Sequence, residues 1–258
     1  MIRPANPVGF ITGGRRGIGR GIAFALADAG FDLVINDIAE DDAMAETLAG
    51  IAARGRRGIA AAGDIADLAR QPDLVARAWD AFGAINCLVN NAGIPVLARG
   101  DLLDLSVESW DRNIATNLRG PFFLTQKIAR RMIAAGDDGR YRSIVCISSA
   151  NARMPSTNRG EYCIAKTGVA MMAQLFAVRL AEHGIGVHDI RPGIIRTEMT
   201  AGVAADYQRR IAAGVSPMPR WGEPADIGRA VAALASGAFA FSTGSAYEID
   251  GGLHINRL

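Results

Sequence analysis

Tyr162 and Lys166 carry the residue types and the spacing in this sequence that best suit proton transfer. Side chains four residues apart lie on one face of a helix, so the ammonium would sit beside the phenol. A free phenol has a pKa of about 10 and is a poor base at neutral pH, but a neighbouring ammonium stabilises the phenolate. Surface helices also carry such pairs by chance. The pattern nevertheless predicts an acid–base site in a helix over about residues 162–182.

Ser149 directly follows a predicted strand over residues 143–148. Open α/β sheets bind ligands at the carboxyl ends of their strands. A hydroxyl at that place could hold a substrate oxygen beside Tyr162. We therefore predict that Ser149 and Tyr162 act on the same oxygen atom.

A glycine-rich segment, Thr12-Gly13-Gly14-Arg15-Arg16-Gly17-Ile18-Gly19, joins the first predicted strand to the first predicted helix. Glycines at 13, 17 and 19 permit a tight turn and a close approach of the backbone to a pyrophosphate. The start of the following helix offers free N–H groups and the positive end of its dipole. A purely structural turn is the alternative, but the position between strand and helix favours dinucleotide binding.

Asp37 ends the second predicted strand, near the spacing from Gly19 at which an acid hydrogen-bonds the ribose diol of NAD. The same carboxylate would repel the 2′-phosphate of NADP, whereas Arg15 or Arg16 could bind it. An exposed turn acid is the alternative, because other acids follow closely. The fold sets the place of Asp37 at the strand end, so we predict NAD as the preferred cofactor, with NADP possible.

Short apolar runs alternate along the chain with longer segments of helical period. This alternation predicts parallel crossovers and helices on both faces of one sheet. No linker, repeat or low-complexity tract divides the sequence. We expect an α/β protein with a doubly wound Rossmann fold, a single domain over residues 1–258 with a seven-stranded parallel sheet. The predicted strands are 8–12, 31–37, 58–62, 86–90, 143–148, 186–190 and 245–249, and the predicted helices are 17–29, 43–54, 68–82, 117–135, 162–182 and 225–236.

The 258 residues are half apolar, and 28 basic and 26 acidic residues give a net charge of +2 without a long block of one sign. We therefore expect no binding to nucleic acid or to membrane surfaces. No apolar run is long enough for a transmembrane helix, and the N-terminus does not resemble a signal peptide. Three widely spaced cysteines indicate a reducing compartment, and the three histidines lack metal-ligand spacing. These features predict a cytoplasmic protein without a metal.

Five motifs follow one another in the order typical of one enzyme family. They are Thr12-Gly13-x-x-x-Gly17-x-Gly19, Asn90-Asn91-Ala92-Gly93, Asn117, Ser149 and Tyr162-x-x-x-Lys166, and a Pro192-Gly193 segment follows. Over essentially its full length the chain resembles the short-chain dehydrogenases/reductases, and within them the 3-oxoacyl-acyl-carrier-protein reductase-like subgroup. The resemblance implies hydride transfer between a nicotinamide and a carbon that bears an oxygen. It also suggests a homotetramer, and the helix over 162–181, apolar nearly all round, supports at least a dimer.

The resemblance also assigns roles to individual residues. Tyr162 exchanges a proton with the substrate oxygen, Lys166 lowers the pKa of Tyr162 and binds the nicotinamide ribose, and Ser149 hydrogen-bonds the substrate. Asn117 interrupts its helix and holds a water in a proton relay from Lys166. The cofactor-binding positions, from the glycine turn to the segment after Pro192, are Gly13, Arg15, Arg16, Gly17, Ile18, Gly19, Asp37, Asp64, Ile65, Asn91, Ala92, Gly93, Tyr162, Lys166, Pro192, Gly193, Ile195 and Thr197.

The segment between Ser149 and Tyr162 is unusually polar for a hydrocarbon pocket, since it contains Asn151, Arg153, Asn158 and Arg159. Solvated loop residues are the alternative. We expect a polar secondary alcohol, such as a sugar or polyol derivative, held by Ser149, Asn151, Arg153, Tyr162 and Met199. Residues 194–222 are predicted to form a lid over this substrate, with a rigid pair of surface helices as the alternative.

Two other functions remain open from the sequence. One is an NADPH-dependent reductase of 3-oxoacyl thioesters, carried on acyl carrier protein or coenzyme A, which would need room for a 2′-phosphate near Asp37. The other is a non-catalytic dinucleotide sensor. Loss of Tyr162 or Lys166 would favour the sensor, but both residues are present.

Overall fold

The computed structural model describes residues 6–256, which form a seven-stranded parallel sheet in the order β3-β2-β1-β4-β5-β6-β7. This order confirms the predicted doubly wound Rossmann fold. The predicted domain bounds, residues 1 and 258, lie outside the described residues. The strands are β1 (Val8–Thr12), β2 (Asp32–Asn36), β3 (Gly58–Ala60), β4 (Cys87–Asn90), β5 (Arg142–Ile147), β6 (Ile185–Pro192) and β7 (Ala246–Ile249).

The direction of winding reverses at β1. The chain runs outward from β1 through β2 to β3, and then returns to place β4 on the other side of β1. Such a reversal opens a crevice at the carboxyl ends of the two central strands, where open sheets bind ligands. The glycine-rich segment follows β1 and the Asn91–Gly93 segment follows β4, so both lie at this crevice.

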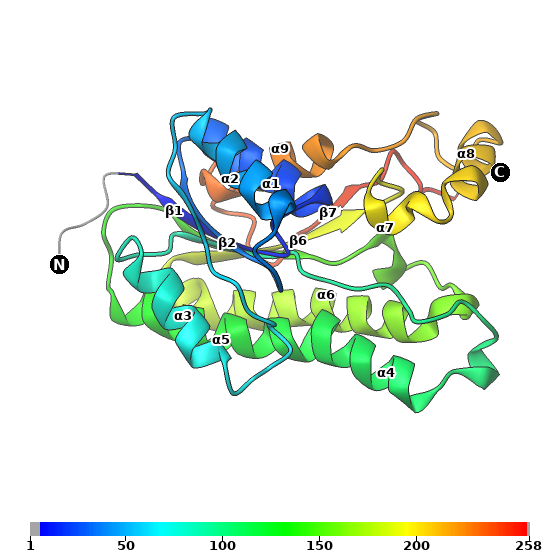
Figure 1. The fold of residues 1–258 in the computed structure, drawn as a ribbon, viewed down its shortest axis with the longest axis horizontal. Coiled ribbons are helices and arrows are strands. Elements are labelled where there is room, and N and C mark those ends of the chain that lie inside the picture. Colours follow the sequence, from blue (N-terminus) through cyan, green and yellow to red (C-terminus); the bar gives the residue numbers. More distant parts are fainter. Residues whose placement is uncertain (1–5, 257–258) are drawn as a thin grey trace.

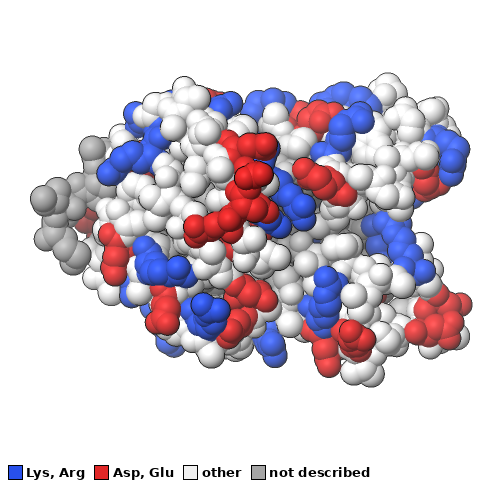
Figure 2. All heavy atoms as spheres, in the orientation of Figure 1, with Lys and Arg blue, Asp and Glu red and all other residues white. Residues whose placement is uncertain are grey.

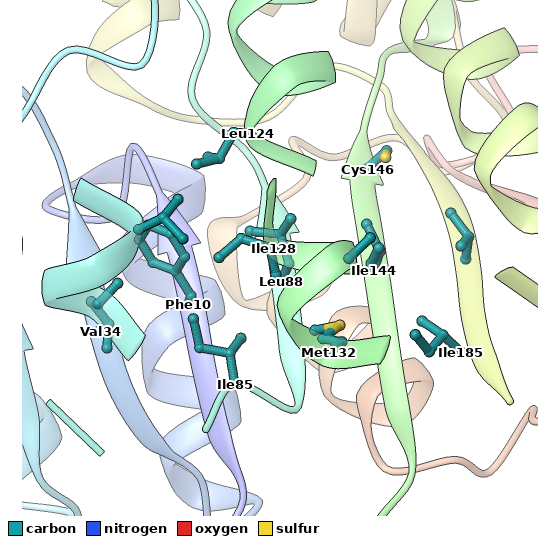
Figure 3. Close-up of a cluster of buried hydrophobic side chains, with 14 of the residues drawn as sticks. Phe10, Val34, Ile85, Leu88, Leu124, Ile128, Met132, Ile144, Cys146 and Ile185 are labelled. Carbon is teal, nitrogen blue, oxygen red and sulfur yellow. The ribbon is translucent and has the colours of Figure 1, made fainter. Parts of the chain in front are cut away.

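Helices cover both faces of the sheet (Figure 1). One face carries α1 (Gly17–Asp28), α2 (Asp42–Ala52) and α9 (Pro224–Ala235), and the other carries α3 (Gln71–Asp80), α5 (Gly120–Ala134) and α6 (Gly160–Leu180). Neighbouring strand residues alternate between the two layers. Phe10, Leu88 and Ile144 belong to the cluster under α5 (Figure 3), whereas Ile11 and Val89 pack in the cluster with α1 and α9. Because both faces are covered, the strands read as continuous apolar runs.

Three helices differ from the sequence-based expectations. α4 (Val107–Ile114) was not predicted, although Ser106 caps it by accepting a hydrogen bond from the N–H of Ser109 at 3.2 Å. It continues through a π-helical turn (Ala115–Arg119) into α5. The predicted lid contains α7 (Glu198–Ala201) and α8 (Ala204–Ala212), in agreement with the helical alternative for its secondary structure.

The helix Thr157–His183 is long and apolar enough to cross a membrane by length and composition, contrary to the expectation from apolar runs. A core helix of a globular protein passes the same test, and α6 packs Val169, Met172 and Ala173 against the sheet. Its opposite side exposes a row of large apolar side chains, Ile164, Met171, Leu175 and Val178.

Candidate functional site

The glycine-rich turn between β1 and α1 leaves no room for side chains at two positions. Gly13 has a φ of +63°, and a Cβ on it would lie 2.8 Å from Cα of Ala92. A Cβ on Gly19 would lie 2.0 Å from the carbonyl oxygen of Gly13. The turn is thus closed tightly onto the first turn of α1, whose free N–H groups form an anion-binding end. This geometry fits the pyrophosphate of a dinucleotide.

Asn91 ties the end of β4 to this turn. Its Nδ2 donates to the carbonyl oxygens of Thr12 and Gly13, each at 2.9 Å. In return, the Thr12 hydroxyl accepts hydrogen bonds from the N–H groups of Asn91 and Ala92, at 3.1 and 3.0 Å. The two strand ends that flank the crevice are therefore held in a fixed relation.

Arg15 pairs with two carboxylates beside the turn. The Arg15 N–H donates to Oδ2 of Asp37 at 3.3 Å, its Nε lies 3.2 Å from Oδ1 of Asp37, and its Nη1 also contacts Asp41. Arg16, in contrast, is exposed. Two acids and one guanidinium leave a net negative charge where the adenosine ribose is expected.

The other predicted cofactor positions lie along the same edge of the sheet. Asp64 follows β3, is exposed, and accepts a hydrogen bond from the N–H of Ala66 at 2.8 Å. Thr197 begins α7 as its N-cap. Pro192 ends β6 and Gly193 follows it, Ile65 and Ile195 are buried, and Ile18, Gly17, Ala92 and Gly93 are half-buried.

Ser149, Tyr162 and Lys166 converge just beyond β5. The Ser149 hydroxyl hydrogen-bonds the Tyr162 phenol. Lys166 is 5% exposed, its Nζ donates to the carbonyl of Ile147 at 2.9 Å, and the same atom lies 5.7 Å from the centre of the Tyr162 ring. One substrate oxygen could therefore meet both the serine hydroxyl and the phenol, with a cation close behind.

Burial has the largest effect on the pKa values of both Tyr162 and Lys166. Burial raises the pKa of Tyr162 above its usual value, while the hydrogen bond from Ser149 and the charge of Arg159 act in the opposite direction. Burial also lowers the pKa of Lys166 to about 8, against the charge of the nearby Asp189. Arg159 is thus one cation that favours the phenolate here, while the ammonium of Lys166, 5.7 Å from the centre of the Tyr162 ring, also donates to the Ile147 carbonyl.

Asn117 lies in the π-helical turn between α4 and α5 and is 1% exposed. Its Oδ1 accepts from the N–H of Ile94 at 2.8 Å, and its Nδ2 donates to the Ile94 carbonyl at 3.0 Å and to Oδ1 of Asn113 at 2.7 Å. The helix interruption predicted at Asn117 is therefore confirmed. A π turn shifts backbone carbonyls out of the regular helical pattern and recurs at functional sites.

A buried ionic chain behind the catalytic group was missed by the sequence analysis. Asp189 accepts hydrogen bonds from the Ser148 hydroxyl and from Nε of Arg191, the latter at 2.7 Å, and Arg191 Nη1 donates to Oε1 of Glu248 at 3.1 Å. Charged residues inside an apolar strand were the available signal, because buried charges need partners.

The residues predicted on the substrate side separate into two groups. Arg159 acts electrostatically on Tyr162 and is therefore near the reacting group. Arg153 instead lies 3.7 Å from Glu248, Asn151 donates to the carbonyl of Met154 at 2.8 Å, and Met199 is exposed on α7. Arg159 is thus the member of this segment whose charge acts on the reacting phenol.

Glu248, Asp250 and His254 bring their ligand atoms within 4.8 Å of one another. These groups already have partners: Arg191 donates to Glu248, and Asp250 accepts from the N–H of His254 at 2.9 Å and contacts its Nδ1 at 2.8 Å. The grouping is explained by these internal contacts.

Comparison with known proteins identifies the class. A family model described as enoyl-(acyl carrier protein) reductase matches residues 13–254. L-rhamnose 1-dehydrogenase (NAD(P)(+)) from Sphingomonas sp. is 36% identical over 95% of both chains. 2-Dehydro-3-deoxy-D-gluconate 5-dehydrogenase from Escherichia coli is 36% identical over 95% of this chain and 94% of its own length. The crystal structure of a 3-oxoacyl-[acyl-carrier protein] reductase from Brucella melitensis in complex with NAD superimposes with a TM-score of 0.95, at 48% identity, over 98% of this chain and 99% of that chain.

The chain belongs to the short-chain dehydrogenase/reductase family. Within that family it falls in the 3-oxoacyl-acyl-carrier-protein reductase-like subgroup. It is an NAD(P)-dependent oxidoreductase that interconverts an alcohol and a carbonyl group.

Proposed function

We propose that this protein is an NAD-preferring dehydrogenase of a polar secondary alcohol, such as a sugar or polyol derivative. Tyr162 is the general acid–base, Ser149 holds the substrate oxygen, Lys166 binds the nicotinamide ribose, and Asn117 positions a water for proton relay. The hydrogen bond between Ser149 and Tyr162 beyond β5 carries this assignment, since it places two hydroxyls where one substrate oxygen can meet both. The nicotinamide, when bound, supplies or accepts the hydride.

The preference for NAD is supported by the charge around the predicted ribose site. The two negative charges of Asp37 and Asp41 exceed the one positive charge of Arg15, so the remaining negative charge would repel a 2′-phosphate. The Brucella melitensis relative is crystallised with NAD. The sugar-like substrate is supported by the names of the two relatives that are 36% identical, which act on L-rhamnose and on 2-dehydro-3-deoxy-D-gluconate.

Reduction of 3-oxoacyl thioesters is the second candidate, favoured by the name of the relative with 48% identity. A direct comparison separates the two. Oxidation of polyols and sugars with NAD is measured beside reduction of acetoacetyl-coenzyme A with NADPH and NADH. Faster turnover of the thioester with NADPH would favour the second candidate.

Tyr162→Phe tests the catalytic assignment. The variant keeps the ring and its packing but lacks the transferable proton, so turnover should fall by a factor of about 100 or more. NAD affinity, measured by fluorescence or calorimetry, should stay close to that of the wild type. Turnover within tenfold of the wild type would exclude this role for Tyr162.

We also propose a homotetramer that uses the exposed side of α6. Ile164, Met171, Leu175 and Val178 lie there with large apolar side chains in solvent. Light scattering of Val178→Glu, which is 84% exposed, tests this proposal. A variant mass equal to that of the wild type would place the interface elsewhere.

A further inference from the structure

Arg159 lies close to the catalytic group in the chain and acts on it by its charge. It ends a short 3-10 turn directly before α6, three residues ahead of Tyr162, and its charge acts on the Tyr162 phenol. Its Nη1 lies 3.4 Å from the hydroxyl of Tyr207, which is carried by α8. The Arg159 guanidinium therefore contacts α8 and acts on the reacting phenol as well.

A second guanidinium reaches the same hydroxyl from another direction. Arg99, in the loop after β4, also hydrogen-bonds Tyr207. Tyr207 is 7% exposed, and burial alone would raise its pKa, yet the hydrogen bond from Arg99 and the charge of Arg159 lower it. Arginine offers only donors, so both guanidinium groups direct N–H groups toward this place. Figure 2 shows basic side chains at this end of the molecule, between the region of α8 and that of α4.

Neither guanidinium is neutralised by the protein. Across residues 6–256 Arg99 and Arg159 form no ion pair with an acid, whereas Arg15 pairs with Asp37 and Arg191 with Asp189. Nε of Arg159 is buried without a hydrogen-bond partner. A buried donor on a charged group is costly when unpaired, so a missing acceptor is expected at this place.

We propose that Arg99, Arg159 and Tyr207 bind an anionic oxygen group of the substrate, and we assign that group to a carboxylate. The inference rests on the proposed dehydrogenase function and narrows its substrate to a polyhydroxy acid or the corresponding oxo acid. The planar guanidinium fork matches a carboxylate in a bidentate geometry. Because the three residues come from the β4 loop, the start of α6 and α8, a bound carboxylate would also join the helical segment to the sheet.

This site would orient the substrate as well as select it. The carboxylate would be fixed beside Arg159, and the alcohol carbon of the same molecule would face Ser149 and Tyr162. Fixing a remote charge holds the reacting carbon in place, which favours the chemical step. A neutral polyol would leave the two guanidinium groups without their acceptor.

A matched set of substrates tests the inference. The wild type is assayed with NAD on an alditol, on the aldonic acid of the same carbon skeleton, and on the alditol phosphate, each in several epimers. We expect kcat/KM for the acid to exceed that for the alditol by about 100-fold. Equal values for acid and alditol would overturn the inference and leave the proposed function intact. A preference for the phosphate would overturn the assignment to a carboxylate. The same panel is also assayed with NADP, and no turnover of any member with NAD or NADP would reject the proposed function itself.

Two variants locate the effect. Arg99→Gln, at an exposed position, and Arg159→Gln should each raise KM for the acid about tenfold or more and reduce its advantage over the alditol. Arg130→Gln, at an exposed position on α5, is the matched control and should leave both substrates unchanged. Equal losses on acid and alditol in both site variants would show a structural role and overturn the proposal.

Discussion

Asp37 and Arg15 meet twice, through the backbone N–H of Arg15 to Oδ2 at 3.3 Å and through its Nε to Oδ1 at 3.2 Å. Both side chains are nearly buried, at 14% and 12% exposure. Asp37, which directly follows β2, therefore also fixes the glycine-rich turn after β1. Since Asp41 contacts the same guanidinium, Arg15 is held by acids and is not free to bind a phosphate.

Asp37→Ala should shift the cofactor preference toward NADP. The variant removes a repulsive charge and one of the two acids that hold Arg15, and loss of a charge-assisted hydrogen bond to the ribose should weaken NAD binding by roughly 1.5–3 kcal/mol. The measurement is kcat/KM for NAD and NADP, with the exposed Asp42→Ala as a control of equal charge change. A wild type that already prefers NADP would contradict the prediction of NAD.

The parts of the site that depend on local spacing could be predicted from the sequence. The glycines after β1 and the pair Tyr162 and Lys166 are close in the chain, and the fold fixes where each segment lies. The helix interruption at Asn117 followed from the family resemblance and is present in the structure.

The convergence of Arg99, Arg159 and Tyr207 could not be predicted in the same way. These residues come from the β4 loop, the start of α6 and α8, and only tertiary packing brings them together. Local polarity singled out Arg153 and Arg159 alike, although Arg153 is directed to Glu248. The short amphipathic helix α8 carries too few apolar positions to stand out from a polar loop.

Removal of the charge at Arg159 should change the pH profile. The groups acting on the Tyr162 phenol include the Ser149 hydroxyl, the Arg159 guanidinium and the Tyr207 phenol, with Lys166 over its ring. Alcohol oxidation needs the deprotonated phenol, so its rate rises with pH through the pKa of Tyr162. Arg159→Gln removes a charge that lowers this pKa and should move the rise toward higher pH.

The profile is measured on a neutral alditol with saturating NAD, so that carboxylate binding does not enter. Arg159→Lys keeps the charge and should keep the profile near that of the wild type. Identical profiles for the glutamine variant and the wild type would contradict the assigned effect of Arg159.

Lys166→Met should stabilise the protein at neutral pH while abolishing turnover. Burial lowers the pKa of Lys166 from 10.5 to about 8. Below pH 8 both folded and unfolded states carry the charge, and the folded state bears the cost of burying it. Between pH 8 and 10.5 the unfolded state binds more protons, so wild-type stability rises with pH.

The variant lacks this cost, so its free energy of unfolding at pH 7 should exceed that of the wild type by about 1–3 kcal/mol, reduced by loss of the bond to Ile147. The gain should shrink toward pH 10.5. Denaturant unfolding of the variant and the wild type at pH 7 and near pH 10.5 measures both the gain and its decrease. A variant less stable than the wild type at pH 7 would show that attraction to Asp189 outweighs burial.

The segment 194–222 has a small core of its own. Tyr207, Ile211 and Trp221 are buried together, and Trp221 Nε1 donates to Oε1 of Gln208 at 2.8 Å. Gly214 follows the C-cap of α8 with a φ of +79°, whereas Gly202 has an ordinary helical conformation, so Gly214 is the better candidate for a hinge. The segment is thus rigid within itself, and a ligand-dependent motion would move α8 as a unit.

We propose that bound NAD and substrate order this segment over the site. Arg209 and Arg210 lie on α8, where trypsin can cleave only after the helix opens locally. Because Tyr207 joins the segment to Arg159 and Arg99, occupation of the site should slow that opening. Limited proteolysis with and without NAD and substrate should therefore show slower cleavage at Arg209 and Arg210 in the bound state, while cleavage at the exposed Arg54 stays unchanged. Equal cleavage rates at α8 in both states would leave the segment as a rigid pair of helices rather than a lid.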